Sequence, residues 1–345
     1  MQTKFLIGTY TKKNSQGIYS VKLDSSTKRL LDLHLLVHTQ NPTYLGVSAA
    51  NNLYTVSKNG ERGGVGAYNL SNAPVTLINE ALGAGSPPAY VGIDEARQLV
   101  FSGNYHQSTV TVFKINADGS ITQTDQVTHQ GLTGPAEEQD TPHVHFCDLT
   151  PDNRLVVCDL GMDLVVVYNV TKDGKLTAVS RYQSEPGFGS RHIAFSPTNP
   201  TIAYLLGELS SNLEVLKYNP VNGEFKHLQT ISTIPADWNT HNGAAAIHVS
   251  SDGKYIYTSN RGQNTIAVFQ TQSDNSVTMI QAISTEGDFP RDFAFDATEN
   301  FIVCANQETD NLTLFERNAT TGLLTLIQKD FPCPEGVCVK LVTQK

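Results

Sequence analysis

The stretch "TVTVFKINADGSITQ" (109–123) decides the fold, because it predicts two short strands joined by a tight turn. Apolar and polar residues alternate before and after "NADGS", and Asn, Asp and Gly are residues that tight turns favour. The same pattern of strand, turn and strand occurs seven times along the chain. The seven copies span residues 17–33, 64–78, 109–123, 164–179, 212–228, 265–280 and 311–327.

The copies are spaced evenly. The first apolar residue after each turn can be compared between copies, and successive ones lie 45 to 55 residues apart. These residues are Leu30, Val75, Ile121, Leu176, Phe225, Val277 and Leu323. About seven such periods account for the whole chain, so we expect one domain over residues 1–345.

Two further strands precede each hairpin. Apolar stretches such as "LVFSGN" (99–104) follow stretches such as "PAYVGID" (88–94), and no segment has helical periodicity. Four antiparallel strands repeated seven times predict an all-β fold, a seven-bladed β-propeller with four strands per blade. The last strand, 336–342, stands alone, so we expect this C-terminal strand to join the N-terminal strands and close the ring.

Composition disfavours several classes of function. The net charge of −9 argues against nucleic-acid binding, which needs a basic surface. No apolar run approaches the roughly 20 residues of a membrane helix, and "MQTKFLIGTYTKKN" (1–14) lacks the pattern of a signal peptide. The five cysteines include no CxxC pair, so we expect reduced thiols in a cytoplasmic protein. The oligomeric state is not readable from the chain.

Topology predicts which end of the propeller carries the chemistry. In an up-and-down blade, the start of the innermost strand and the end of the second strand lie at the same end. Unusual polar residues gather at these positions, whereas the opposite turns have ordinary turn sequences such as "SSDGK" (250–254). The innermost strands supply His143, His145, Arg191, His192, His241 and Arg291. The second strands and the loops after them supply Asn104, His106, Glu208, Asn260 and Arg261.

This gathering of arginines and histidines in an acidic chain predicts a site for a small anion, a carboxylate or a phosphate. His143 and His145 are two residues apart, so they are expected to share one strand face. Two histidines do not make a metal site, and we expect neither a metal nor a cofactor. Structural roles stay open: the arginines could bridge blades, Glu208 could only pair with an arginine, and Asn104 and Asn260 could only shape turns.

At these residues the sequence resembles the seven-bladed propeller lactonases, of the bacterial 6-phosphogluconolactonase and fungal carboxymuconate cyclase type. Ser190 departs from the family's sequence pattern, in which a proline is common directly before the arginine that corresponds to Arg191. The aspartates of "DLGMD" are expected to organise their own turn. The resembling stretches run in order through nearly the whole chain: "GTYT" (8–11), "SGNYH" (102–106), "TPHVHF" (141–146), "DLGMD" (159–163), "PGFGSRHIAFSP" (186–197), "GELSS" (207–211), "SDGKYIYTSNRG" (251–262) and "FPRDFAFD" (289–296).

The resemblance implies a lactone hydrolase for a small anionic sugar lactone, with 6-phospho-D-glucono-1,5-lactone of the pentose phosphate pathway as first candidate. Glu208 or a histidine would activate water, while Arg191 and Arg261 would bind the carbonyl oxygen or the substrate anion. Two alternatives stay open: a carboxymuconate-type cycloisomerase, and a non-catalytic propeller that binds a small anionic ligand. The catalytic candidates are His145 (or His143), Arg191, Glu208 and Arg261. The substrate-binding candidates are His143, His106, Asn104, His192, His241, Asn260 and Arg291.

Overall fold

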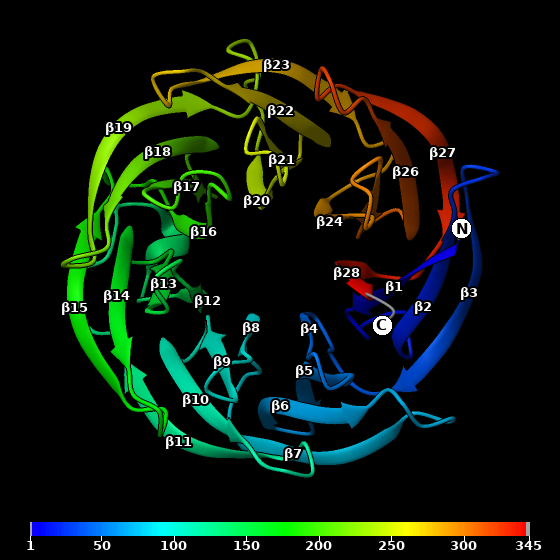
Figure 1. The fold of residues 1–345 in the computed structure, drawn as a ribbon, viewed down its shortest axis with the longest axis vertical. Coiled ribbons are helices and arrows are strands. Elements are labelled where there is room, and N and C mark those ends of the chain that lie inside the picture. The colour runs from blue at the N-terminus through cyan, green and yellow to red at the C-terminus, as the bar shows by residue number, and fades with distance from the viewer. Residues whose placement is uncertain (1, 343–345) are drawn as a thin grey trace. The chain divides into compact units, whose positions relative to one another are not determined.

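The computed structural model describes residues 2–342 and contains, within that range, 28 β-strands and one short 3-10 helix. The strands form seven antiparallel sheets of four strands each, which Figure 1 shows as separate blades. The fold is therefore a seven-bladed β-propeller, and the prediction from the repeat is confirmed.

One compact unit comprises, within the described range, residues 2–38, 194–216 and 227–342. Three complete sheets belong to it, in the strand orders β28-β1-β2-β3, β20-β21-β22-β23 and β24-β25-β26-β27. Their strands are β1 (Gln2–Thr9), β2 (Gly17–Asp24), β3 (Arg29–His38), β20 (Gly243–Val249), β21 (Tyr255–Arg261), β22 (Thr265–Thr271), β23 (Val277–Ser284), β24 (Pro290–Phe295), β25 (Phe301–Asn306), β26 (Asn311–Arg317), β27 (Leu324–Pro332) and β28 (Gly336–Val342).

The second compact unit comprises residues 39–193 and 217–226. Its three complete sheets are made of β4 (Leu45–Val47), β5 (Asn52–Asn59), β6 (Arg62–Asn69), β7 (Thr76–Ala84), β8 (Tyr90–Asp94), β9 (Leu99–Asn104), β10 (Thr109–Ile115), β11 (Ile121–Thr128), β12 (Val144–Leu149), β13 (Leu155–Asp159), β14 (Leu164–Val170) and β15 (Leu176–Gln183). The 3-10 helix η1 (Glu137–Gln139) precedes β12. The remaining sheet has residues in both units and contains β16 (Ser190–Phe195), β17 (Ile202–Gly207), β18 (Asn212–Asn219) and β19 (Glu224–Ser232).

The first sheet combines the two ends of the chain, as the lone C-terminal strand predicted. β28 pairs antiparallel with β1, with Lys4 opposite Val342 and Thr9 opposite Gly336 (Figure 1). This pairing covers the backbone edge of β1 that would otherwise lack a partner strand.

Hydrophobic clusters fill the space between neighbouring sheets within each unit. In the first unit, Phe5 and Val21 pack in one cluster with Val303 and Leu314 of the sheet β24–β27. In the second unit, a cluster that includes Phe113 joins the sheets β4–β7 and β8–β11. Each fully buried side chain of this size contributes about 1.5–3 kcal/mol. The alternation that identified the strands thus places apolar side chains between sheets.

In the last repeat, the first apolar residue after the turn is not the first buried residue. Leu323 is the first apolar residue after the last turn, but it is 38% exposed, whereas Leu324 is 3% exposed and begins β27.

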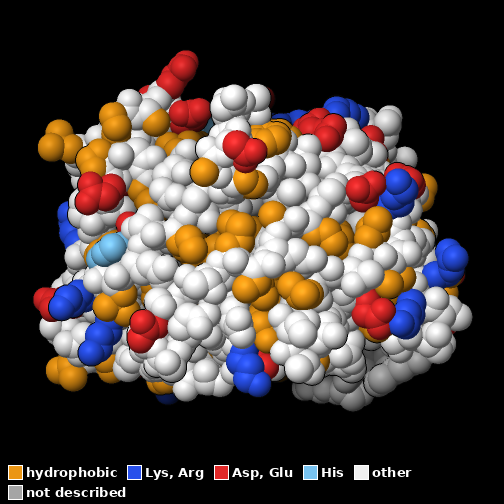
Figure 2. Space-filling model, turned by 90° about the horizontal axis from the view of Figure 1, so that it is seen from above, with side chains coloured by type: hydrophobic (Ala, Val, Ile, Leu, Met, Phe, Trp, Pro, Cys, Tyr) orange, Lys and Arg blue, Asp and Glu red, His pale blue; other side chains and the backbone are white. Residues whose placement is uncertain are grey.

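On the face drawn in Figure 2, acidic and basic side chains are interspersed.

The five cysteines are buried free thiols, and burial raises the pKa of Cys147 and Cys158. In the described range, no helix is long and apolar enough to cross a membrane.

Candidate functional site

His143, just before β12, is held by contacts to both ring nitrogens. Its ring stacks on Tyr105 with 4.0 Å between centroids and 8° between planes. Nδ1 lies 2.9 Å from the carbonyl oxygen of Tyr105, and Nε2 lies 2.9 Å from the carboxylate of Asp140. Both ring nitrogens therefore face hydrogen-bond acceptors. The hydrogen bond with His143 lowers the pKa of Asp140.

His145 occupies a β-bulge. In the pairing of β12 with β13, Val144 lies opposite Asp159 and Phe146 lies opposite Cys158, so His145 is the extra residue. Its ring lies 6.0 Å from that of Tyr105, whose ring also stacks on His143. Bulges redirect side chains near functional sites.

Arg191 and His192 follow Ser190, the first residue of β16, and both are buried, at 2% and 8% exposed. Nη1 of Arg191 lies 3.5 Å from Nε2 of His192. The ring of His192 lies 5.2 Å from that of His145 and 5.1 Å from that of Phe146. The second unit therefore brings together three of the predicted residues, which we call the histidine–arginine cluster: His145, Arg191 and His192.

A row of aromatic rings that was not predicted from the sequence adjoins this cluster. Tyr44 lies 4.1 Å from Tyr90, and Tyr90 lies 4.4 Å from Phe146 and 5.6 Å from His192. The hydroxyl of Tyr90 donates to Asp148 at 2.9 Å, and burial raises its pKa well above the ordinary value. The signal was present, because Tyr44 and Tyr90 each follow a proline by two residues at the start of an innermost strand.

In the first unit, Glu208 and Arg261 form an ion pair, with 2.8 Å between Oε1 and Nη2. Arg261 is 6% exposed and also donates to the carbonyls of Gly243 and Ala244, at 3.1 and 3.3 Å. Its guanidinium carbon lies 5.8 Å from the ring centroid of Phe289. Such a pair can present one carboxylate oxygen and a fixed positive charge to a substrate.

The other candidates in the first unit are Arg291 and His241. Arg291 is the bulged residue of β24, because Pro290 lies opposite Asn306 and Asp292 lies opposite Ala305. Its guanidinium carbon lies 5.5 Å from the ring centroid of Tyr10. His241 is exposed in the loop before β20.

The two asparagines make structural hydrogen bonds. Asn104 donates to the carbonyl of Ser86 at 2.8 Å and accepts from the backbone of Gln107 at 3.0 Å. Asn260 is fully buried; it donates to the carbonyl of Thr233 and accepts from the Thr233 hydroxyl. These bonds agree with the turn-shaping alternative. His106 is exposed in the turn between β9 and β10, with its ring edge-on to Tyr105.

Within residues 2–342, no three His, Cys, Asp or Glu side chains come close enough together to hold a metal ion. The structure brings together two sets of candidate groups: the imidazoles and guanidinium of the histidine–arginine cluster, and the Glu208–Arg261 pair.

Comparison with known proteins agrees with this architecture. The model of the family described as "Lactonase, 7-bladed beta-propeller" matches residues 4–341. This chain belongs to that lactonase family. The 6-phosphogluconolactonase of Bacillus subtilis is 42% identical over 350 residues, covering 99% of both chains.

Two solved structures are similar to this chain over nearly its whole length. A protein from Lactobacillus plantarum is 53% identical, with a TM-score of 0.98, and the match covers 99% of this chain and 100% of that one. The periplasmic gluconolactonase PpgL of Pseudomonas aeruginosa is 28% identical, with a TM-score of 0.92 and coverage of 99% of both chains. The family resemblance is confirmed, and the chain is a lactonase-family protein.

Proposed function

We propose that this protein hydrolyses a small anionic sugar lactone, with 6-phospho-D-glucono-1,5-lactone as the first candidate. The observation that carries the proposal is the histidine–arginine cluster, buried at the starts of β12 and β16 in a chain of the lactonase family. A buried guanidinium binds carboxylate or phosphate strongly, and adjacent imidazoles can move protons. The name of the B. subtilis relative supports the phosphorylated substrate.

The proposed reaction needs no covalent intermediate. A base takes a proton from water while the water oxygen attacks the lactone carbonyl, and the carbonyl oxygen becomes an oxyanion. The tetrahedral intermediate collapses, the ring C–O bond breaks, and the leaving alkoxide takes a proton. The product is a hydroxy acid, which releases one proton as its carboxylate forms at neutral pH. We assign the oxyanion or the substrate phosphate to Arg191, and proton transfer to His145.

Glu208 and Arg261 are a second pair of catalytic candidates in this proposal. Glu208 would act as an alternative base, and Arg261 would bind negative charge on the substrate. A double-mutant cycle tests whether they act as a unit with Arg191, because residues that act together give non-additive losses in log kcat/KM. Strict additivity of R191K and E208Q in log kcat/KM would show that Arg191 and Glu208 act independently of each other.

We also propose a cytoplasmic role in the pentose phosphate pathway, because a phosphorylated sugar does not cross a membrane unaided. Cell fractionation with an antibody to the protein tests this location. Recovery with secreted or periplasmic proteins would contradict it and would favour an unphosphorylated lactone.

The decisive experiment is a pH-stat assay, since hydrolysis releases one proton per lactone. The purified protein is compared on 6-phosphogluconolactone and on unphosphorylated gluconolactone, each corrected for spontaneous hydrolysis. We expect a higher kcat/KM for the phosphorylated substrate. A rate equal to background on both lactones would refute the hydrolase and favour a non-catalytic propeller, and turnover of a carboxymuconate alone would favour the cycloisomerase.

A further inference from the structure

The turn between β13 and β14 carries two buried carboxylates, Asp159 and Asp163, which are 0% and 1% exposed. The sequence predicts that they organise their own turn. They do so in part, because Asp159 accepts a hydrogen bond from the backbone of Met162 at 3.0 Å. Most of their hydrogen bonds, however, lead to segments outside the turn.

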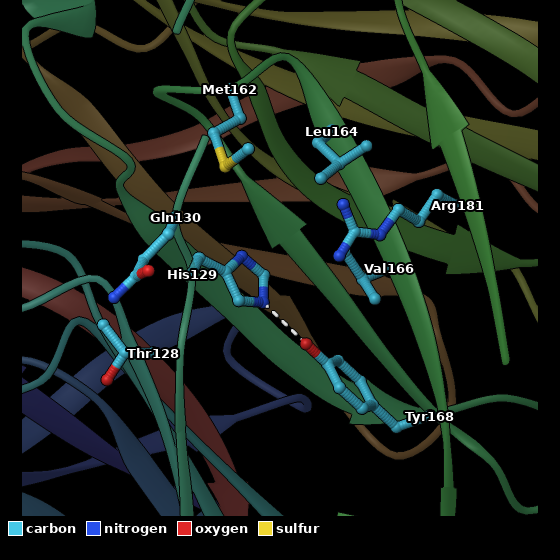
Figure 3. A pocket seen from close by; sticks show the side chains of 8 residues that line it. All are labelled: Thr128, His129, Gln130, Met162, Leu164, Val166, Tyr168 and Arg181. Atoms are coloured by element: carbon cyan, nitrogen blue, oxygen red, sulfur yellow. Dashed lines mark hydrogen bonds between the residues drawn. The ribbon is translucent and has the colours of Figure 1, made fainter. Parts of the chain in front are cut away.

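Asp159 binds the segment that enters β12. Its Oδ1 accepts from the backbone N–H of His143 at 2.8 Å. Its Oδ2 lies 2.7 Å from Nδ1 of His129, and Nε2 of His129 lies 2.9 Å from the hydroxyl of Tyr168 (Figure 3). Because the carboxylate accepts all three bonds, Nδ1 of His129 carries a proton, and the Tyr168 hydroxyl is the hydrogen-bond partner of Nε2.

Asp163 binds the segment that enters β16. Its Oδ1 accepts from the backbone N–H of Gly189 and from Nε2 of Gln139, both at 2.6 Å. Its Oδ2 accepts from the backbone N–H of Gly187 at 2.8 Å. Gly187 and Gly189 have φ values of 83° and 70°, which glycine adopts readily, and Arg191 follows two residues later.

One five-residue turn thus holds the starts of two neighbouring innermost strands through charge-assisted hydrogen bonds. One strand carries His145, and the other carries Arg191 and His192. We propose that Asp159 and Asp163 are positioning residues that set the spacing between the parts of the histidine–arginine cluster. This inference rests on the proposed function for its kinetic consequences. A misplacement of about 1 Å at a reacting centre can lower the rate about 100-fold.

Substitution by asparagine is expected to disturb the hydrogen bonds of Asp163 more than those of Asp159. In D159N, the amide oxygen can still accept from His143 and Met162. Its NH₂ can donate to Nδ1 of His129 if the ring changes tautomer, so that Nε2–H donates to the Tyr168 oxygen (Figure 3). In D163N, both carboxylate oxygens face backbone N–H groups, so either orientation sets the new NH₂ against a donor at Gly187 or Gly189.

Asp296 of the first unit provides a matched control. It is 3% exposed and accepts from the backbone N–H of Phe301 on Oδ1 and from that of Thr298 on Oδ2, at 2.8 and 3.1 Å. D296N therefore creates the same kind of donor conflict in a turn that holds no candidate site residue.

The test compares kcat and KM of D163N, D159N and D296N on the lactone that the wild type hydrolyses, well below their melting temperatures. We expect kcat of D163N to fall about 100-fold with KM changed by less than about 3-fold, and D159N and D296N to keep kcat within about 3-fold. The melting temperatures of D163N and D296N should fall to a similar extent. A kcat of D163N equal to that of D296N would overturn the proposal.

Crystal structures of wild type, D163N and D296N test the inference without any activity. We expect Gly187–Arg191 to move by about 1 Å relative to β12 in D163N only. Superposable cluster atoms in D163N would overturn the positioning role, whatever the substrate proves to be. If D163N does not fold, Q139M removes one of the three bonds to Asp163, and an unchanged kcat and structure for Q139M would then overturn it.

Discussion

The guanidinium of Arg261 lies 2.8 Å from the carboxylate of Glu208 while it also donates to two backbone carbonyls of β20. The backbone bonds fix the arginine, and the ion pair fixes the glutamate against it. Glu208 is 21% exposed at its side chain, so this carboxylate remains open to solvent while its partner is buried.

Replacing Glu208 by Gln tests whether the carboxylate works as a base. Gln can still accept from Arg261 through its amide oxygen, so the fold should persist, but it cannot take a proton from water. We expect kcat to fall by about 10²–10⁴-fold in the pH-stat assay. E316Q serves as the control, since Glu316 is ion-paired with Lys28 on the surface. A kcat for E208Q near that of E316Q would exclude Glu208 as the base.

Gly243→Ala tests the placement of Arg261 without removing it. A Cβ at this position would lie 2.9 Å from Nη2 of Arg261 and 3.7 Å from Cγ of Glu208. The side chain of Arg261 must therefore shift by a few tenths of an ångström. We expect a drop of about 10-fold in kcat/KM with a melting temperature close to that of the wild type. An unaltered kcat/KM would show that the reaction does not depend on the position of Arg261.

Arg191→Lys keeps the charge but removes the planar donor pair that recognises a carboxylate or phosphate. We expect kcat/KM for the phosphorylated lactone to fall at least about 100-fold. R317K is the matched control, because Arg317 is also buried and donates from Nε to Tyr257 at 2.8 Å. If both variants lose activity equally, the loss reflects a general cost of replacing a buried arginine.

The raised pKa of Tyr168 predicts that the protein loses stability at alkaline pH. Burial raises its pKa to about 12, so the folded protein keeps this proton when the unfolded chain, with a pKa near 10, has lost it. The contribution is fully present below pH 10 and declines as the pH rises from about 10 to about 12; at pH 11 the loss is about 1.4 kcal/mol. Urea unfolding at pH 8 and pH 11 should show a smaller decline for Y168F than for the wild type. Equal declines would contradict the raised pKa.

Much of the fold could be predicted, because each hairpin carries its own turn residues and alternation. The lone strand at 336–342 even predicted its pairing with β1, since an unpaired strand needs a partner. The sequence does not show which of Leu323 and Leu324 faces the core, because both follow the turn and only the pairing of β27 with β26 decides it.

The candidate site was less predictable, because bulges and side-chain networks decide it. The alternation of apolar and polar residues does not reveal the β-bulges at His145 and Arg291. It also does not show that Asp140 and Tyr105 engage both ring nitrogens of His143. Tyr90 was read only as a strand residue, although its ring lies beside His192.

The pairing of β1 with β28 has a consequence for synthesis. Residues 4–9 leave the ribosome long before their partners at 336–342 are synthesised. The sheet β28-β1-β2-β3 therefore cannot be completed until β28 has been synthesised, and one edge of β1 has no partner strand until then. The slowest step of folding should be this last docking, at very long sequence separation, and the nascent chain is most exposed to aggregation before it.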